Sequence, residues 1–214
     1  MTLLVEELLV KSRERVRAYG EVFTPRHMVD RMLDIVADDL ELGPDFIDKT
    51  FLEPAAGDGN FLVAILERKL KAVQARIQPE LWPQESLFAL ASIYGIELLE
   101  DNHADAKAAM LKVFVDFHRS NGTGCGPRTD LHRAAAFLIK TNILRGNTLT
   151  GLDHRGEDLE FSWWHRDPDV AGTVLREPFR FASLREDSLF NVLEPRGFVP
   201  CAVDQVHHEK RHDG

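Results

Sequence analysis

The chain has 214 residues, of which 44% are hydrophobic and 29% charged, with 14 glycines and 10 prolines. This composition is ordinary for one soluble globular domain and excludes disordered and fibrous proteins. Acidic residues outnumber basic ones by 35 to 26, which gives a net charge of −9 and not the basic field of a free-standing nucleic-acid binder. Contact with DNA would therefore need a local basic patch or a partner protein.

Targeting and metal-binding patterns are missing from the sequence. No apolar run approaches the roughly 20 residues of a membrane-spanning helix, and Glu6 and Glu7 lie where a secretion signal carries basic residues. We therefore expect a cytoplasmic protein without membrane contact. Cys125 and Cys201 lie far apart, and neither has the spacing of a disulfide framework or of a zinc site. The sequence predicts no bound metal.

The N-terminal part, residues 1–45, is predicted to be helical. Residues 3–18 place leucines at near-helical spacing among charged residues, which indicates an amphipathic helix. Thr24 and Pro25 then provide an N-cap and a first-turn proline for a second helix. Gly43 and Pro44 end this segment.

Strands and helices alternate through residues 46–155, which we expect to form one ligand-binding domain. The predicted elements are a strand at 50–53, a helix at 61–70, a helix at 87–91, a strand at 93–98, a helix at 100–117, a loop at 120–127, a helix at 129–139 and a strand at 142–145. Strands that alternate with helices imply a parallel α/β sheet with right-handed crossovers.

The pattern weakens after Gly151. Residues 156–200 are expected to form a short extension with strands near 159–163 and 178–181, and residues 201–214 an unstructured tail. The tail holds His207, His208 and His212, for which a coincidental metal site is the alternative. Trp163 and Trp164 are assigned to the core or to an interface; a base-stacking platform is the alternative.

The most informative segment is residues 53–59, with the sequence EPAAGDG. A strand that ends in an acid and leads through two glycines into a helix lets the backbone pass close to a ligand. The third glycine of a dinucleotide fingerprint and the Lys of a P-loop are both missing. Glu97, at the end of the second strand, can accept hydrogen bonds from both hydroxyls of a ribose. These features predict a nucleoside ligand without phosphates, and S-adenosylmethionine is the candidate.

Four segments together resemble the N6-adenine DNA methyltransferases of restriction–modification systems. Residues 53–59 look like the glycine-rich cofactor loop of that family, and residues 20–25 (GEVFTP) resemble the segment that precedes it. Residues 94–97 (YGIE) are similar to the ribose-binding strand, and residues 146–149 (GNTL) to the Gly-Asp-x-Leu turn beside the adenine ring. The four segments occur in the order of the family.

The resemblance implies a Rossmann-like class I methyltransferase fold, here with a partial parallel sheet preceded by N-terminal helices. It also implies a set of cofactor-binding residues: Phe23 and Thr24 at the methionyl end, Glu53 at its amino group, Ala55, Gly57 and Gly59 in the loop, Glu97 at the ribose, Ile96 and Leu98 beside the adenine, and Asn147 at its exocyclic nitrogen. Asn147 replaces the usual Asp, and a plain turn residue is the alternative for it.

One motif of the family is missing. Adenine methyltransferases carry Asn/Asp-Pro-Pro-Tyr/Phe, whose polar groups accept from the adenine amino group and whose ring stacks on the flipped base. The nearest fragments here, at Pro168 and Pro178, lack the second proline, so no catalytic residue is assigned.

Three hypotheses about function stay open. The first is a DNA adenine methyltransferase completed by a partner subunit or a second copy. The second is a non-catalytic subunit that binds S-adenosylmethionine and regulates or assembles a DNA-modification system. The third is a small-molecule methyltransferase with an altered pocket.

Overall fold

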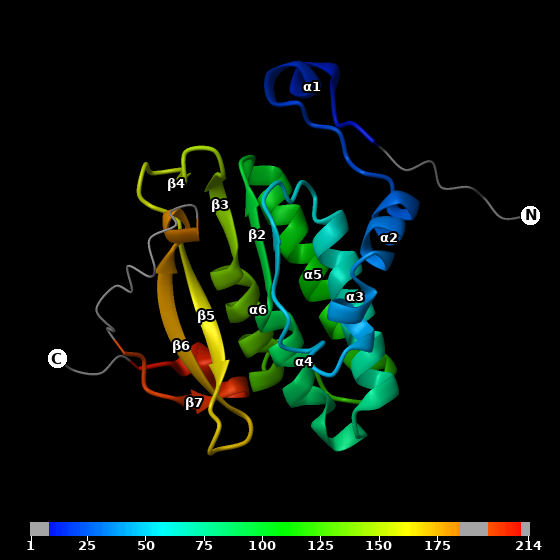
Figure 1. The fold of residues 1–214 in the computed structure, drawn as a ribbon, viewed down its shortest axis with the longest axis vertical. Coiled ribbons are helices and arrows are strands. Elements are labelled where there is room, and N and C mark those ends of the chain that lie inside the picture. Colours follow the sequence, from blue (N-terminus) through cyan, green and yellow to red (C-terminus); the bar gives the residue numbers. More distant parts are fainter. Residues whose placement is uncertain (1–8, 185–196, 211–214) are drawn as a thin grey trace, which may run out of the picture.

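The computed structural model describes residues 9–184 and 197–210. Its centre is a four-stranded sheet in the order β1-β2-β3-β4 (Figure 1). The strands are β1 (Phe51–Glu53), β2 (Ile93–Glu97), β3 (Ile143–Asn147) and β4 (Leu152–Asp153). β1, β2 and β3 are parallel, and β4 runs antiparallel to β3. The expected mixed α/β architecture with a mostly parallel sheet is confirmed, and it is compatible with a Rossmann-like fold.

Helices connect the parallel strands and pack against the sheet. They are α3 (Asn60–Arg76) and α4 (Trp82–Ala91) between β1 and β2, and α5 (Glu100–Ser120) and α6 (Asp130–Asn142) between β2 and β3. Their apolar faces supply most of the main core, including the fully buried Leu62, Leu66, Met110 and Phe114. The chain also forms two short helical turns, η1 (Asp38–Leu42) before β1 and η2 (Pro79–Leu81) before α4.

A second, antiparallel sheet contains β5 (Glu160–Arg166), β6 (Thr173–Arg180) and β7 (Cys201–Ala202). It meets residues of β2 through a separate aromatic cluster in which Tyr94 packs edge-on against Phe161 and Trp163. Trp163 stacks on Phe179 with ring centroids 4.4 Å apart. Trp164 donates its indole N–H to Asn142 Oδ1 at 2.8 Å. Both tryptophans therefore pack within the protein.

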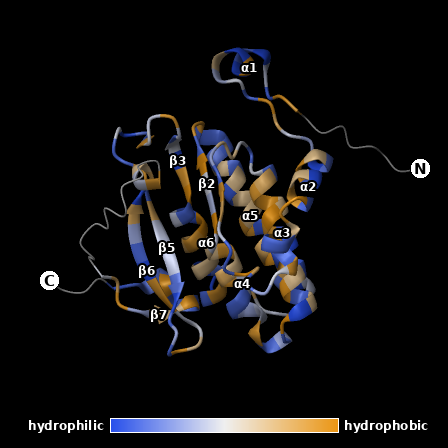
Figure 2. Ribbon diagram, viewed as in Figure 1, coloured by the Kyte–Doolittle hydropathy of each residue, from blue (hydrophilic) through white to orange (hydrophobic). Residues whose placement is uncertain are grey.

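The N-terminal part differs in length from the expected helix. α1 (Arg13–Tyr19) begins after Ser12, whose hydroxyl accepts from the Arg15 N–H, and residues 1–8 lie outside the described part. α2 (Arg26–Asp34) forms where a second helix was predicted, but it begins one residue later: Pro25 is its N-cap in place of Thr24, and no side chain caps the helix. In Figure 1 α1 projects beyond the sheet at the end toward which β2 and β3 point. None of its residues is buried, and much of it is hydrophilic in Figure 2, whereas apolar residues gather in the middle of the molecule.

The C-terminal part differs from the expected unstructured tail. After η3 (Phe181–Leu184), the chain resumes at residue 197 and forms β7 and then η4 (Val203–His208). Val203 and Val206 are buried in the main core, and this burial holds the segment against α6. His212 lies outside the described residues. Across the parts of the chain that the structure describes, no helix is both long enough and apolar enough to cross a membrane.

Candidate functional site

A pocket of about 660 Å³ lies where β1, β2 and β3 end. The last residues of these strands, Glu53, Glu97 and Asn147, all line it. Its other lining residues come from three segments: residues 19–24, residues 54–61, and residues that follow β2 and β3. In open α/β sheets, ligands bind in the crevice beyond the carboxyl ends of the strands. The position of the pocket thus agrees with the predicted ligand site.

The turn between β1 and α3 has two glycines with different roles. Gly57 and Gly59 have φ angles of +56° and +99°, which residues with a Cβ rarely adopt. A Cβ on Gly59 would lie 2.9 Å from the Cα of Ala106 in α5. A Cβ on Gly57 would lie 3.3 Å from the ring of Phe23, beside the pocket. Gly57 therefore lets the Phe23 ring pack closely against the turn, and Gly59 lets α3 start against α5.

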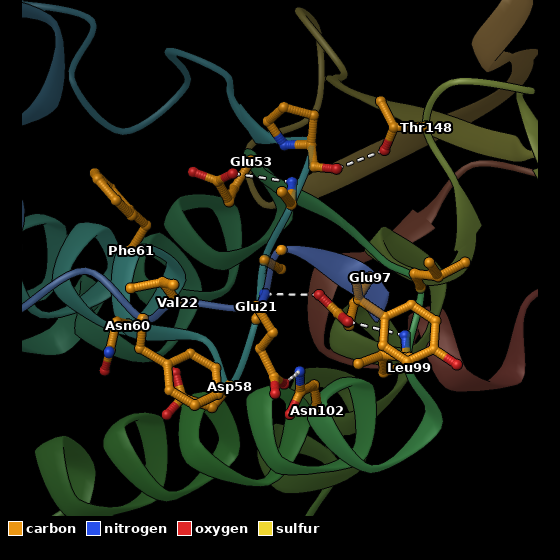
Figure 3. Close-up of a pocket in the computed structure, with 18 of the residues that line it drawn as sticks. Glu21, Val22, Glu53, Asp58, Asn60, Phe61, Glu97, Leu99, Asn102 and Thr148 are labelled. Carbon is orange, nitrogen blue, oxygen red and sulfur yellow. Dashed lines mark hydrogen bonds between the residues drawn. The ribbon is translucent and has the colours of Figure 1, made fainter. Parts of the chain in front are cut away.

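Glu97 braces this glycine turn against β2. One carboxylate oxygen accepts the Gly57 N–H at 2.7 Å, and the other accepts the Leu99 N–H at 2.8 Å (Figure 3). The residue is only 7% exposed. Each carboxylate oxygen has a second lone pair, so ribose hydroxyls can still bind at this edge. Glu97 therefore shapes the pocket even without a ligand.

Two acceptor oxygens at the pocket have no hydrogen-bond donor among the described residues. Asp58 Oδ1 and Asn102 Oδ1 are buried and have no hydrogen-bond partner among the described residues, and both residues line the pocket. Burial raises the pKa of both the Asp58 and the Glu53 carboxyl groups, although Glu53 accepts the Ala55 N–H at 2.9 Å. Buried acceptors are normally satisfied, so a rotation of these side chains toward the pocket would let donors of a ligand satisfy the two oxygens.

Residues 11–24, which we call the N-terminal strap, are attached to the start of α5 by polar contacts. Arg15 pairs with Glu21 and with Asp101, each at 2.6 Å. Asn102 donates to Glu21 at 2.6 Å. Burial opposes ionisation of Glu21, but the guanidinium of Arg15 and the Asn102 amide outweigh it and lower the pKa of Glu21. The strap thus contributes a charged acid to the rim of the pocket.

The turn after β3 closes the remaining side of the pocket. Asn147 Oδ1 accepts the Leu149 N–H at 2.8 Å, and Thr148 donates its hydroxyl to the carbonyl of Pro54. The latter contact joins this turn to the glycine turn (Figure 3). The side-chain oxygen of Asn147 therefore caps its own turn, which is the alternative left open for this residue, while Asn147 also lines the pocket.

The structure brings most of the predicted site residues together. The ones that line the pocket are Phe23, Thr24, Glu53, Ala55, Gly57, Glu97, Leu98 and Asn147. Gly59 is outside the lining, and Ile96 is fully buried in the aromatic cluster against the second sheet. Ile96 points away because successive side chains of a strand alternate between its faces.

Five further lining residues were not singled out from the sequence: Tyr19, Asn60, Phe61, Leu99 and Asn102. Asn60, Phe61 and Asn102 lie in the first turns of α3 and α5. The first turn of a helix that follows a parallel strand borders the ligand crevice, so position in the chain could have indicated these three. Tyr19 ends α1 and carries no such indication.

The pocket is acidic. Its lining contains Glu21, Glu53, Asp58 and Glu97, and no Lys, Arg or His is among the described lining residues. Such a lining attracts a cationic ligand and repels phosphate groups.

Comparison with known proteins adds no relative: no protein-family model, no curated protein and no solved structure matches the chain. The class of ligand therefore has to follow from the pocket itself, that is, from its position, its unpaired acceptors and its charge.

Proposed function

We propose that this pocket binds S-adenosylmethionine. The observation that carries the proposal is an acidic lining without basic residues at the carboxyl edge of a parallel sheet. S-adenosylmethionine bears a sulfonium and an ammonium group against one carboxylate, so its net charge is positive. Dinucleotides and nucleoside triphosphates bear negative phosphates, which Glu53, Asp58 and Glu97 would repel. The charge of the lining therefore favours S-adenosylmethionine over dinucleotides and nucleoside triphosphates, which are the commoner ligands of parallel α/β sheets.

The hydrogen-bonding groups of the cofactor also suit the pocket. The ribose hydroxyls, the adenine amino group and the ammonium group are donors, and the pocket offers the acceptors Glu97, Asp58 and Asn102. A donor at Asp58 Oδ1 or Asn102 Oδ1 would satisfy an oxygen that has no partner among the described residues. The lining residues Phe23 and Phe61 supply apolar surface beside them.

We further propose that the chain is the cofactor-binding part of a DNA methyltransferase of the adenine-N6 class, as the motif order suggests. S-adenosylmethionine, when bound, would supply an electrophilic methyl group to the amino nitrogen of an extruded adenine by in-line attack; the S–CH3 bond breaks, S-adenosylhomocysteine leaves, and the amino nitrogen loses one proton to solvent. The residues of this chain bind and orient the cofactor. Since the Asn/Asp-Pro-Pro-Tyr/Phe motif is missing from the sequence, a partner has to supply the acceptors for the adenine amino group.

The edge of the main sheet supports such a partner. In the described part, β1 pairs on one side only, with β2. Beside it lies a second hollow of about 200 Å³, with apolar walls that include Phe51, Leu52, Trp163 and Phe179. An unpaired edge next to an apolar hollow is suited to strand addition by another chain. A partner of this kind would also provide the basic surface for DNA that a net charge of −9 makes scarce here.

A ligand panel tests cofactor binding. Calorimetry with S-adenosylmethionine, S-adenosylhomocysteine, NAD⁺ and ATP should show saturable binding of the two adenosyl-sulfur compounds only. Binding of ATP or NAD⁺ at least as tight as that of S-adenosylmethionine would contradict the charge argument.

A second assay measures methyl transfer to adenine-containing DNA by the chain alone and with its neighbouring subunits. We expect transfer only in the complex.

The non-catalytic alternative is favoured by one observation, the missing adenine-binding motif. In that case the chain binds the cofactor as a regulatory or assembly subunit of a DNA-modification system. Cofactor affinity that persists while every complex fails to methylate DNA would establish this alternative over the enzyme.

A further inference from the structure

A second polar cluster lies far from the pocket. Asp130 is the first residue of α6, and His207 and His208 end η4. One carboxylate oxygen and one ring nitrogen from each histidine all lie within 4.8 Å of one another. In Figure 1 the segment around β7 lies at the bottom, whereas β2 and β3 point toward the top, where the pocket is. The cluster is therefore independent of the proposed cofactor site.

Packing explains why these residues meet. Val203 and Val206 are buried against the main core and position η4 beside α6. Gln205 donates its amide N–H to Asp130 Oδ2 at 3.1 Å, which leaves Oδ1 facing His207. The histidine pair is thus held at the start of a helix by apolar contacts on the same short turn.

The burial of His207 and its unpaired ring nitrogens indicate a bound ligand. Its side chain is 9% exposed. Both of its ring nitrogens are buried without a hydrogen-bond partner among the described residues. The Asp130 Oδ1 atom lies 3.4 Å from Nε2, an ion-pair contact that is longer than an ordinary hydrogen bond. A buried imidazole with unsatisfied ring nitrogens costs free energy, and an ion bound to one of the two nitrogens would recover part of it.

We propose that Asp130, His207 and His208 bind one divalent transition-metal ion of the zinc class. Imidazole nitrogen and carboxylate oxygen bind zinc at about 2.0–2.2 Å, so the ligand atoms of a tetrahedral ion lie about 3.3–3.6 Å from one another. The three ligand atoms here already lie within 4.8 Å of one another, and small side-chain rotations would close the difference. Two nitrogens and one oxygen select Zn²⁺, Co²⁺ or Ni²⁺ over Mg²⁺ and Ca²⁺, which prefer oxygen ligands. Three protein ligands leave the fourth position to water.

One neighbouring cation competes with the ion. Arg133 Nη1 lies 3.6 Å from Asp130 Oδ1, and both side chains are 46% exposed. Because Arg133 is this exposed, it can move into solvent when a metal ion takes its place. A bound ion would join η4, and with it β7, to the first turn of α6. Its role is therefore to fasten the C-terminal segment to the helical layer.

Cobalt titration of the full chain tests the site. After treatment with a chelator, Co²⁺ should produce visible d–d absorption that saturates at one equivalent, and Zn²⁺ should abolish it. His207→Asn and Asp130→Asn should each weaken Co²⁺ binding by on the order of tenfold or more. The matched control is His165→Asn, which changes an exposed histidine on β5 and should leave the titration unchanged.

Two results would overturn the site: no d–d absorption in the wild type, or equal Co²⁺ affinity in the wild type and in the His207→Asn variant. Circular dichroism and S-adenosylmethionine calorimetry on each variant show whether it is folded. If His207→Asn unfolds the chain, Asp130→Asn and His208→Asn carry the same test, since both of those residues are exposed. Zinc should also raise the melting temperature of the wild type, and of the His165→Asn control, but not of the ligand variants.

Discussion

The floor of the pocket, by which we mean the glycine turn at residues 53–59 together with Glu97, and the N-terminal strap are stabilised by different interactions. In the floor, Glu97 accepts main-chain N–H groups of Gly57 and Leu99 and is almost completely buried. The strap is held by ion pairs such as that between Arg15 and Asp101, whose side chains are 24% and 49% exposed. Buried hydrogen bonds to a charged group are strong and insensitive to salt, whereas exposed ion pairs are weak and screened. The floor is therefore preformed, and the strap is adjustable.

The largest effect is expected from the glycine that supports the floor. Gly59→Ala introduces a Cβ that would lie 2.9 Å from the Cα of Ala106, at a φ of +99°. We expect it to lower the free energy of unfolding by about 2–4 kcal/mol, from strained backbone and from crowding between α3 and α5. Urea unfolding followed by circular dichroism measures this change.

A second glycine provides the matched control. Gly122 also has a positive φ, +73°, but a Cβ there would meet nothing within 4 Å. Gly122→Ala should therefore cost only the backbone term, about 1 kcal/mol. Equal losses in the two variants would refute the close packing of the glycine turn against α5.

Glu97→Ala should cause the next largest effect, and it should act on the cofactor. The substitution removes the acceptor of the Gly57 and Leu99 N–H groups and the predicted ribose acceptor. We expect S-adenosylmethionine to bind more weakly by on the order of 1–3 kcal/mol, roughly 5- to 150-fold. Calorimetry measures the loss, and Glu80→Ala, an exposed acid in η2, is the control. Unchanged affinity in Glu97→Ala would remove Glu97 from the site.

Acid should weaken cofactor binding through Glu53 and Asp58. Burial raises the pKa of both carboxyl groups in the free protein, so they take up protons at a higher pH than an exposed acid. A cationic ligand favours their ionised forms and lowers these pKa values. Affinity should therefore be constant at high pH and fall by up to about tenfold per pH unit and group as the pH drops through the raised values.

Calorimetry in buffers of different ionisation enthalpy checks this linkage. Binding at mildly acidic pH should release protons, because the ligand drives the two carboxyl groups toward ionisation. Proton uptake, or tighter binding at lower pH, would show that the positive groups of S-adenosylmethionine do not lie near Glu53 and Asp58.

The smallest effect is expected from the strap. Arg15→Met removes the partner of Glu21 and Asp101 and should weaken S-adenosylmethionine binding by about two- to fivefold at low salt. The difference from the wild type should shrink near about 1 M NaCl, where the exposed pair with Asp101 is screened, whereas the pair with Glu21, whose side chain is 6% exposed, is screened less. A difference that does not shrink at high salt would mean that the strap is as rigid as the floor.

The parallel sheet and a ligand site at its carboxyl edge could be predicted from the sequence because the determining signals are local. Apolar periodicity marks each helix, and Gly57 between a strand and a helix marks the crossover. Glu97 could be placed opposite Gly57 since parallel neighbouring strands end at the same edge, and the structure joins the two by a hydrogen bond. The ligand and the reaction stay predictions.

Other features depend on contacts between distant parts of the chain, which no local pattern reveals. η4 forms because Val203 and Val206 find an apolar surface on the core, although its sequence is that of a polar tail. Gly59 is required by Ala106, far along the chain in α5. Ile96 and Leu98 are both apolar, and only the second sheet determines that Ile96 faces the aromatic cluster.

A crystal structure with S-adenosylhomocysteine tests the central claim most directly. We expect density for the adenosyl group beyond the ends of β1 and β2, with ribose hydroxyls within hydrogen-bonding distance of the Glu97 carboxylate and a donor at Asp58 or Asn102. A pocket that stays empty at saturating ligand, or that binds the adenosyl group away from Glu97, would contradict the account.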